Sequence, residues 1–462
     1  MPPVNGSERS TRKPRSGDGR GSGESRVGGV TDARVAAALI LSDMRQGDLL
    51  DGAFERRSAP LDARDRRWLH EMLWGMLRRR GWLDAVLAAR VNGGLAKLEP
   101  DVVDLLRAGS YQLLFMGSVP AYAAIAQTVE LTKRRDGIGA SKLVNAVLRR
   151  IDRERDTLEP SLPADPVEAL ATRHSHPSWV VARWVERWGL ADTERLLIVN
   201  NEEAPITVRP HGVSREQLAA SLAGAGVETH DVPLVADSIR LGTGVALTEL
   251  GAFRQGHLYV QDPAATLVVQ YAAIPPGAVV ADLCAAPGGK ALELARTASL
   301  VVAADRSASR TERMLVGLGR LDGQRIVNLI ADASAPAIAE MDVVLVDVPC
   351  TGTGTFRRHP DARWRLRVSD FAVLGASQRA ILRAASQVVK PGGLLVYSTC
   401  SLELDENDDV IESFLATHTN FVLEPPPAGT VPATVLDDGR LRVLPQRHGT
   451  DGAFAVRLRR VA

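Results

Sequence analysis

Cysteine is scarce in this chain: the 462 residues include three, with no CxxC pair. An odd number of widely spaced cysteines argues against a disulfide framework and a structural zinc centre, so we expect free thiols and no metal. Long apolar stretches are also missing, since none approaches the ~18 residues that span a membrane. The first residues lack the apolar core of a secretory signal. We therefore expect a cytoplasmic protein without a membrane partner.

The net charge of +1 conceals local clusters of charge. Residues 1–30 are rich in glycine, serine, arginine and proline and lack apolar periodicity, which predicts a disordered basic tail. Such a tail either adds phosphate contacts to an RNA partner or serves as a solubilising extension. The length of the chain is typical of about three domains.

Residues 31–160 have the pattern of a helical bundle, because apolar residues recur at spacings of three and four. Short links with glycine or proline separate the expected helices, which cover residues 33–44, 63–89, 99–116, 121–135 and 140–152. Two basic clusters, residues 78–80 and 133–135, lie within this region. They fit either a phosphate-binding side or a solvated helix face.

Residues 161–250 combine strand and helix patterns, which predicts a small α+β connector domain. In residues 251–462, apolar strands alternate with amphipathic helices. The expected strands cover residues 279–284, 300–306, 325–332, 342–349, 393–400, 421–425 and 454–460. Near-continuous apolar strands separated by helices are typical of an α/β, Rossmann-like domain with a mostly parallel, doubly wound sheet.

The first of these strands runs into the glycine-rich sequence CAAPGGK at residues 284–290. Glycine lets backbone amides approach a bound ligand closely, and the sequence lacks the first glycine and the serine or threonine of a Walker A loop. Asp305 and Asp332 end the next two strands, where a carboxylate can accept hydrogen bonds from ribose or lie beside an adenine. These features favour a nucleoside cofactor; the alternative is that the two acids cap turns.

Cys350 and Cys400 each follow a strand, in the sequences DVPCTGTG and YSTCS. Open α/β sheets gather catalytic groups at such strand ends, although cysteine is also a common buried small residue. Beyond Cys350, the sequence RRHPDARWRLR is crowded with arginine. Its place beside a catalytic cleft predicts RNA-phosphate contacts from Arg357, Arg358, Arg363 and Arg365. Trp364 in the same segment either stacks on a base or packs in the core.

Two parts of the chain resemble known families. The helical region is similar to the RNA-binding NusB fold in the sequences DARDRRWLHEMLWGMLRRR, LRAGSYQLLFMGSVPAYAAIAQTVELTK and KLVNAVLRRI. The sequences DLCAAPGGK, DVPCTGTG and YSTCS resemble the motifs of the bacterial Sun/Fmu family of RNA cytosine carbon-5 methyltransferases. Together the resemblances cover nearly everything after the tail. They imply an S-adenosylmethionine-dependent enzyme that methylates small-subunit (16S) ribosomal RNA.

The resemblance also implies roles for individual residues. Cys400 would attack carbon 6 of the cytosine, Cys350 would assist release of the product, and Asp347 would contact both the cofactor and the edge of the base. In DNA cytosine methyltransferases the cysteine of a Pro-Cys pair attacks instead, so spacing alone does not decide between the two thiols. The expected cofactor contacts are Cys284, Ala285, Ala286, Pro287, Gly288, Gly289, Lys290, Asp305, Asp332 and Asp347.

Two alternatives to this function stay open at the level of the sequence. A member of the same family would methylate transfer RNA, and an RNA-binding assembly factor would carry an inactive methyltransferase half. The intact motifs around Cys350 and Cys400 argue against the assembly factor. The NusB-like region favours ribosomal RNA, by resemblance.

Overall fold

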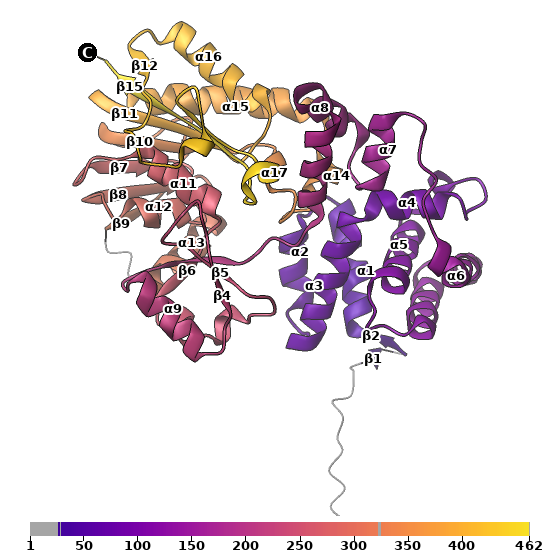
Figure 1. Ribbon diagram of the computed structural model, residues 1–462. Coiled ribbons are helices and arrows are strands. Elements are labelled where there is room, and N and C mark those ends of the chain that lie inside the picture. The colour runs from indigo at the N-terminus through magenta and orange to yellow at the C-terminus, as the bar shows by residue number, and fades with distance from the viewer. Residues whose placement is uncertain (1–25, 28, 322–324, 462) are drawn as a thin grey trace, which may run out of the picture. The chain divides into compact units, whose positions relative to one another are not determined.

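The computed structural model describes residues 26–27, 29–321 and 325–461 (Figure 1). Within the described part, no helix is long and apolar enough to cross a membrane. The chain divides into two compact units. The first unit comprises the chain up to Met72 and Leu98–Asp156, and the second comprises Leu73–Lys97 and Thr157–Ala462.

Most of the predicted tail, residues 1–25 and 28, lies outside the described residues. Its end is ordered, because Arg26–Val27 (β1) and Val30–Thr31 (β2) pair as antiparallel strands. Val30 is fully buried in a cluster with Ala38, Leu105 and Leu131. The prediction of a disordered tail through residue 30 is therefore wrong at its last residues, where an apolar side chain joins the core.

The first unit is helical, as predicted. Its elements are α1 (Asp32–Arg45), α2 (Leu50–Ser58), the first part of α3 (Ala63–Arg78), α5 (Pro100–Phe115) and α6 (Ala121–Glu154). α6 joins the last two expected helices across a kink at Gly137, whose φ of 88° lies in the left-handed region. α2 was not predicted, because its sequence LDGAFERRS contains few apolar residues.

The helices of the second unit include the end of α3 and α4 (Arg80–Ala88), which break at Arg79. The predicted helical stretch over residues 63–89 therefore consists of two helices. Two further helices, α7 (Pro166–Arg173) and α8 (Ser178–Asn201), precede the first strand of the connector. Trp184 of α8 is buried in a cluster with Phe356 and Leu402, which follow Cys350 and Cys400 in the chain.

The connector is an antiparallel sheet with strand order β4-β5-β3-β6 and one helix packed on it. Its elements are β3 (Thr207–Pro210), α9 (Arg215–Gly224), β4 (Thr229–Asp231), β5 (Ile239–Leu241) and β6 (Leu258–Val260). A 3-10 turn (Leu247–Glu249) and α10 (Gly251–Arg254) separate the last two strands. β6 lies beyond the expected boundary at residue 250, because Val260 pairs with Val208 across this sheet.

The central sheet has nine strands in the order β13-β14-β15-β11-β10-β7-β8-β9, with β12 beside β15. All seven expected strands are present, as β7 (Val279–Asp282), β8 (Leu300–Asp305), β9 (Ile326–Ile330), β10 (Met341–Asp347), β11 (Val389–Thr399), β12 (Phe421–Leu423) and β15 (Ala453–Arg460). β13 (Leu436–Asp437) and β14 (Arg440–Val443) add an unexpected edge. Five strands run parallel, whereas β12 to β15 pair antiparallel, so the sheet is mixed.

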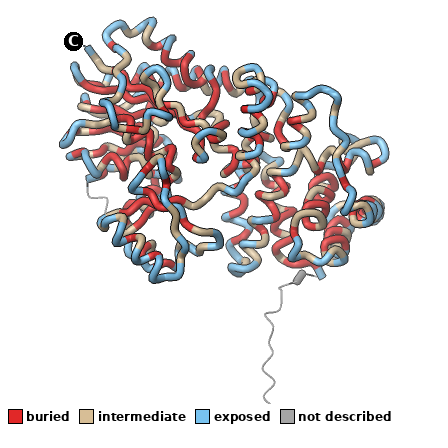
Figure 2. The backbone as a smooth tube through the Cα atoms, in the orientation of Figure 1, coloured by how far each residue is buried: buried red, intermediate tan, exposed pale blue. Residues whose placement is uncertain are grey.

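Helices cover both faces of the central sheet (Figure 2). α11 (Pro263–Ala272), α12 (Gly289–Leu294) and α13 (Ala308–Arg320) pack on one face, and α15 (Val368–Gln387) and α16 (Asp408–Thr417) on the other. Successive residues of β10 alternate between the two cores, as Leu345 and Val346 do. Because both faces are covered, polar groups gather at the carboxyl ends of the strands.

Short elements complete the carboxyl edge and the end of the chain. They are the 3-10 turns Thr353–Thr355 (η4), Leu404–Glu406 (η5) and Ala433–Val435 (η6) and the helices α14 (Ala362–Arg365) and α17 (Pro445–His448). η4 follows Cys350 and η5 follows Cys400, so each thiol lies between a strand and a turn.

Candidate active site

The glycine-rich loop connects β7 to α12 and is held against β8. Ala285 N donates to a backbone carbonyl of β8 at 2.9 Å, and Ala286 N donates to Asp305 Oδ2 at 3.3 Å. Gly288 has a φ of 101°, and a Cβ atom there would lie 2.8 Å from Cγ of Met314. The loop therefore requires glycine at this position, both for its backbone conformation and for its contact with α13.

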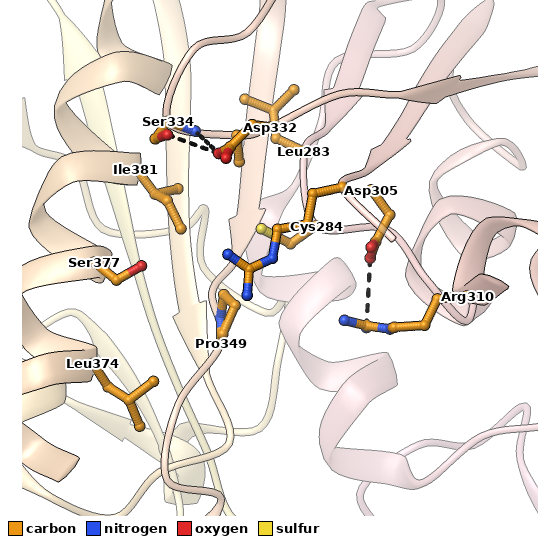
Figure 3. Close-up of a pocket in the computed structure, with 12 residues that line it drawn as sticks. Leu283, Cys284, Asp305, Arg310, Asp332, Ser334, Pro349, Leu374, Ser377 and Ile381 are labelled. Atoms are coloured by element: carbon orange, nitrogen blue, oxygen red, sulfur yellow. Dashed lines mark hydrogen bonds and ion pairs between the residues drawn. The ribbon is translucent and has the colours of Figure 1, made fainter. Parts of the chain in front are cut away.

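A cavity of about 130 Å³ opens beside this loop (Figure 3). The buried carboxylate of Asp305 accepts a hydrogen bond from Ser307 N at 2.9 Å and lies 3.5 Å from the Arg310 guanidinium. Asp332 accepts from the backbone N and the Oγ of Ser334, at 2.8 and 2.7 Å, and these bonds hold the pKa of Asp332 below its usual value. The remaining lining residues are Leu283, Cys284, Arg306, Ala333, Pro349, Leu374, Ser377 and Ile381.

The chemistry of this lining fits a nucleoside. Apolar side chains such as Leu283 and Ile381 can flank a flat base, and carboxylates can accept from ribose hydroxyls or an exocyclic amine. The sequence placed three of the residues here, since Cys284 and both acids end predicted strands. It missed the α15 side chains at 374, 377 and 381, whose helical spacing was their only signal.

The three thiols are in different surroundings. Burial raises the pKa of the Cys284 thiol, which fits a loop residue better than a nucleophile. Cys350 and Cys400 follow the neighbouring parallel strands β10 and β11, and their Sγ atoms are 3.3 Å apart. The hydrogen bond to Cys400, together with burial, raises the pKa of Cys350. The two thiols therefore lie at the ends of neighbouring strands.

Asp347, at the end of β10, contacts both Lys290, beside the glycine-rich loop, and Ser398 of β11. Its Oδ1 accepts from Ser398 Oγ and its Oδ2 from Lys290 Nζ, both at 2.7 Å. Burial by itself would lower the pKa of Lys290, but the charge and hydrogen bond of Asp347 outweigh it and raise that pKa. Lys290, beside the glycine-rich loop, is therefore directed at the end of β10.

Asp282 ends β7 as a buried acid. It is 1% exposed, and its carboxyl group interacts with the backbone of Cys284. Burial and the charge of Asp347 raise the pKa of Asp282 to about 7, against the opposing charge of Lys290. This burial was not predictable, because an acid at the end of a strand usually meets solvent or a cap.

Two glycines support the backbone of Cys400. Gly354 N donates to Cys400 O at 3.0 Å, and Gly452 N donates to Gly354 O at 2.8 Å. A Cβ atom on Gly354 would lie 2.6 Å from Cys400 O and 2.7 Å from Gly452 Cα. This close backbone approach fixes the loop after Cys350 against the loop that contains Cys400.

Three segments of the chain match models of known protein families. Residues 271–459 match the 16S rRNA methyltransferase RsmB/F model, residues 31–153 match the NusB family, and residues 176–248 match the ferredoxin-like domain of RsmF/B-like methyltransferases. A probable ribosomal RNA small subunit methyltransferase B of Synechocystis is 35% identical over 93% of this chain and 100% of its own length. The chain belongs to the RsmB/F methyltransferase family.

Further relatives agree with this RsmB/F assignment. The ribosomal RNA small subunit methyltransferase B of Vibrio cholerae is 33% identical over 93% of this chain and 97% of its own. The crystal structure of PH0851 has a TM-score of 0.78 and 26% identity, over 94% of this chain and all of that one. NSun6 from Pyrococcus horikoshii, solved with SFG, shares the fold at a TM-score of 0.55 and 19% identity, over 61% of this chain and 97% of its own. The cofactor of this methyltransferase family is S-adenosylmethionine.

The structure corrects the prediction for the arginine-rich segment of this RsmB/F family member. Arg363 is fully buried, donates to the carbonyls of Asn200 and Phe356 at 2.8 and 3.1 Å, and has its pKa lowered by burial to about 9. Arg357 is 3% exposed and donates to Asp451 at 2.9 Å. The prediction that these two arginines bind RNA phosphates is wrong, because their guanidinium groups bind the protein interior.

The other two arginines predicted to bind RNA, Arg358 and Arg365, are partly exposed. Arg358 pairs with Asp262 and Asp451 at 2.5 Å, and its side chain is 26% exposed. Arg365 pairs with Asp361 at 3.0 Å, and its side chain is 41% exposed. Both remain predictions as RNA contacts.

Trp364 packs within the second unit. Its indole donates to Leu77 O at 2.9 Å, and the Arg80 guanidinium lies 5.0 Å from the ring. Of the two predicted roles for Trp364, the structure therefore favours packing over base stacking.

The two helical basic clusters make contacts within their own units. Arg78 donates to Arg357 O at 3.0 Å. Arg134 pairs with Glu130, and Arg135 with Asp101, at 3.0 and 2.9 Å. These contacts fit the alternative of a solvated helix face for residues 133–135.

Proposed function

We propose that this chain transfers a methyl group from S-adenosylmethionine to carbon 5 of a cytosine in 16S ribosomal RNA, through a covalent cysteine adduct at carbon 6. The observation that supports this most directly is the pair of thiols with sulfurs 3.3 Å apart. They lie at the ends of adjacent strands, and Pro349 beside Cys350 lines the cavity next to the glycine-rich loop. One thiol is enough to attack a ring, whereas two allow separate attack and release.

The first step uses Cys400. Its thiolate adds to carbon 6 of the cytosine, so a sulfur–carbon bond forms and the electron pair of the carbon 5–carbon 6 double bond makes carbon 5 nucleophilic. S-adenosylmethionine supplies an electrophilic methyl group. Lys290 and Asp347 can hold the polar edge of the ring during attack, since their paired charges face the same strand ends. The cytosine must be unpaired or flipped, because carbon 6 is inaccessible inside a stack.

The second step uses Cys350. A base must remove the proton of carbon 5, so that the double bond reforms and the Cys400 sulfur leaves as a thiolate. In the free protein, the neighbouring Cys400 raises the pKa of Cys350. Once the Cys400 sulfur is bonded to the ring, its thiol no longer raises that pKa. Cys350, after giving its own proton to solvent, would accept the proton of carbon 5.

The proposed cofactor contacts include residues that line the cavity. We assign Asp305 to the ribose hydroxyls and Asp332 to the adenine, with the CAAPGGK backbone around the remainder of the cofactor. Asp347 links the cofactor loop to the reacting base through Lys290. Arg358 and Arg365 are the proposed phosphate contacts that remain.

The proposed substrate is 16S ribosomal RNA, because relatives that match over nine tenths of the chain are named for the small ribosomal subunit. The NusB-like helices would add RNA-binding surface. We place the reaction in the cytoplasm, where free thiols such as these three persist.

Methylation assays on defined RNAs test this proposal. Purified protein is incubated with labelled S-adenosylmethionine and either undermethylated 16S ribosomal RNA or transfer RNA, and digested nucleosides are identified by mass spectrometry. We expect 5-methylcytidine in the ribosomal RNA. Label in transfer RNA alone would assign the other substrate, and RNA binding without any methyl transfer would indicate an assembly factor.

A further inference from the structure

Two consecutive residues, Glu406 and Asn407, form hydrogen bonds with the loops that contain Cys350 and Cys400. Glu406 ends η5 and is fully buried, and Asn407 precedes α16 and is 2% exposed. The hydroxyl of Tyr397 in β11 donates to Glu406 O at 2.5 Å, which ties this turn to the strand that leads to Cys400. Buried polar side chains are costly unless they are hydrogen-bonded, so their partners indicate what they hold in place.

The Glu406 carboxylate and Gln378 together hold the residues on both sides of Cys350. Thr351 donates to it twice, from the backbone N at 2.9 Å and from Oγ1 at 2.5 Å. Gln378 Nε2, from α15, donates to Glu406 Oε1 at 3.0 Å and to Pro349 O at 2.9 Å. Cys350 therefore lies between two residues that are both bound to the buried Glu406–Gln378 pair.

The Asn407 side chain holds the residues on both sides of Cys400. Thr399 Oγ1 donates to Asn407 Oδ1 at 2.6 Å, and Asn407 Nδ2 donates to Ser401 O at 2.9 Å. One amide thus binds the residue before Cys400 and the residue after it. The two adjacent side chains, Glu406 and Asn407, therefore bracket the two thiol loops from one turn.

We propose that Glu406 and Asn407 are positioning residues that set the distance between the two thiols, Glu406 through the Cys350 loop and Asn407 through the Cys400 loop. The proposal rests on the proposed function for the roles of the thiols in attack and release. The sulfurs belong to loops that follow different strands, so their 3.3 Å separation depends on how each loop is held. A displacement of about 1 Å in such a site can slow a reaction about 100-fold.

The distance can be measured without RNA, as the rate at which diamide couples the two thiols. Cys350 and Cys400 each lose one hydrogen to diamide, which is reduced to the hydrazine, and a disulfide forms between them. We compare the wild type with Glu406→Ala, Asn407→Ala and the conservative Glu406→Gln, and quantify the cross-linked peptide by mass spectrometry. We expect coupling to slow by about tenfold or more in the alanine variants and to recover in Glu406→Gln, whose amide oxygen can still accept from Thr351 N.

Glu403 provides a matched control for these variants. It is a buried carboxylate in the same segment, but it accepts from Trp184 Nε1 at 2.9 Å and from Arg183 Nε at 3.1 Å. Glu403→Ala should lower the melting temperature and leave the coupling rate near that of the wild type. Equal coupling rates in all folded variants would overturn the proposal, and so would equal slowing in Glu403→Ala.

A second assay separates the two residues in the reaction with 16S ribosomal RNA and S-adenosylmethionine. Glu406→Ala should accumulate a denaturant-stable protein–RNA adduct, as a variant defective in release, and Asn407→Ala should form little adduct, as a variant defective in attack. Identical behaviour of the two variants would contradict the division between them. If Cys350→Ala itself accumulates no adduct, the proposed roles of the thiols fail, whereas the diamide rates still decide the positioning.

Discussion

Asp282 combines complete burial with a pKa raised to about 7, from 3.8 for an ordinary aspartate. Between about pH 4 and pH 7 the folded protein holds a proton on this group that the unfolded chain has lost. The stability associated with this carboxyl is therefore fully present below about pH 4 and decreases as the pH rises to about 7. Across that range the decrease is about 4 kcal/mol.

Asp282→Asn removes this titration and keeps the size of the side chain. Relative to the wild type, the free energy of unfolding of the variant should rise by about 2.5 kcal/mol between pH 5 and pH 8, because only the wild type must ionise a buried group. Urea unfolding followed by tryptophan fluorescence measures this free energy of unfolding. Six of the seven tryptophans lie in the second unit, which contains Asp282.

An exposed aspartate serves as the control for this experiment. Asp231→Asn changes a side chain that is 86% exposed in the same unit, and the stability difference should be the same at both pH values. A difference for Asp282→Asn that does not change with pH would refute the reasoning, since it would mean that the carboxyl is already ionised and solvated in the folded protein.

Three other substitutions test separate parts of the account. Gly354→Ala places a Cβ atom 2.6 Å from Cys400 O. We expect the variant to lose about 1–3 kcal/mol of stability in thermal unfolding and to transfer methyl groups more slowly. Gly317→Ala is the control and should be tolerated, because a Cβ atom there meets nothing within 4 Å. Arg363→Met should destabilise by about 3 kcal/mol, leaving RNA affinity in filter binding unchanged; weakened binding by a fully folded variant would contradict its structural role. Asp305→Ala should weaken S-adenosylmethionine binding about tenfold or more in calorimetry, and unchanged affinity would remove it from the cofactor site.

The parallel part of the central sheet was predictable because its strands are apolar runs bounded by polar or glycine-rich turns. The neighbouring positions of Cys350 and Cys400 then followed from the usual strand order of the fold. β13 and β14 were missed because they are two and four residues long, with alternating polar and apolar side chains around Asp438-Gly439. That alternation indicates an antiparallel edge rather than a buried strand.

Whether a charged side chain faces solvent or the protein interior was not predictable from the sequence. A run of arginines has the same sequence whether it faces phosphate or, like Arg363, backbone carbonyls in the interior. The bonds of Glu406 to Thr351 and Gln378 also join residues that are distant in sequence. No local pattern specifies such contacts, because they depend on which loops the sheet brings together.

The most direct test of the central claim is the amount of covalent protein–RNA adduct formed by each thiol variant. Wild type, Cys350→Ala and Cys400→Ala are incubated with 16S ribosomal RNA and S-adenosylmethionine and resolved under denaturing conditions. Our account predicts that Cys350→Ala accumulates the adduct, because it attacks but releases slowly, and that Cys400→Ala forms none. Adduct in Cys400→Ala but not in Cys350→Ala would reverse the roles of the thiols, and undiminished methyl transfer by both variants would contradict the thiol mechanism.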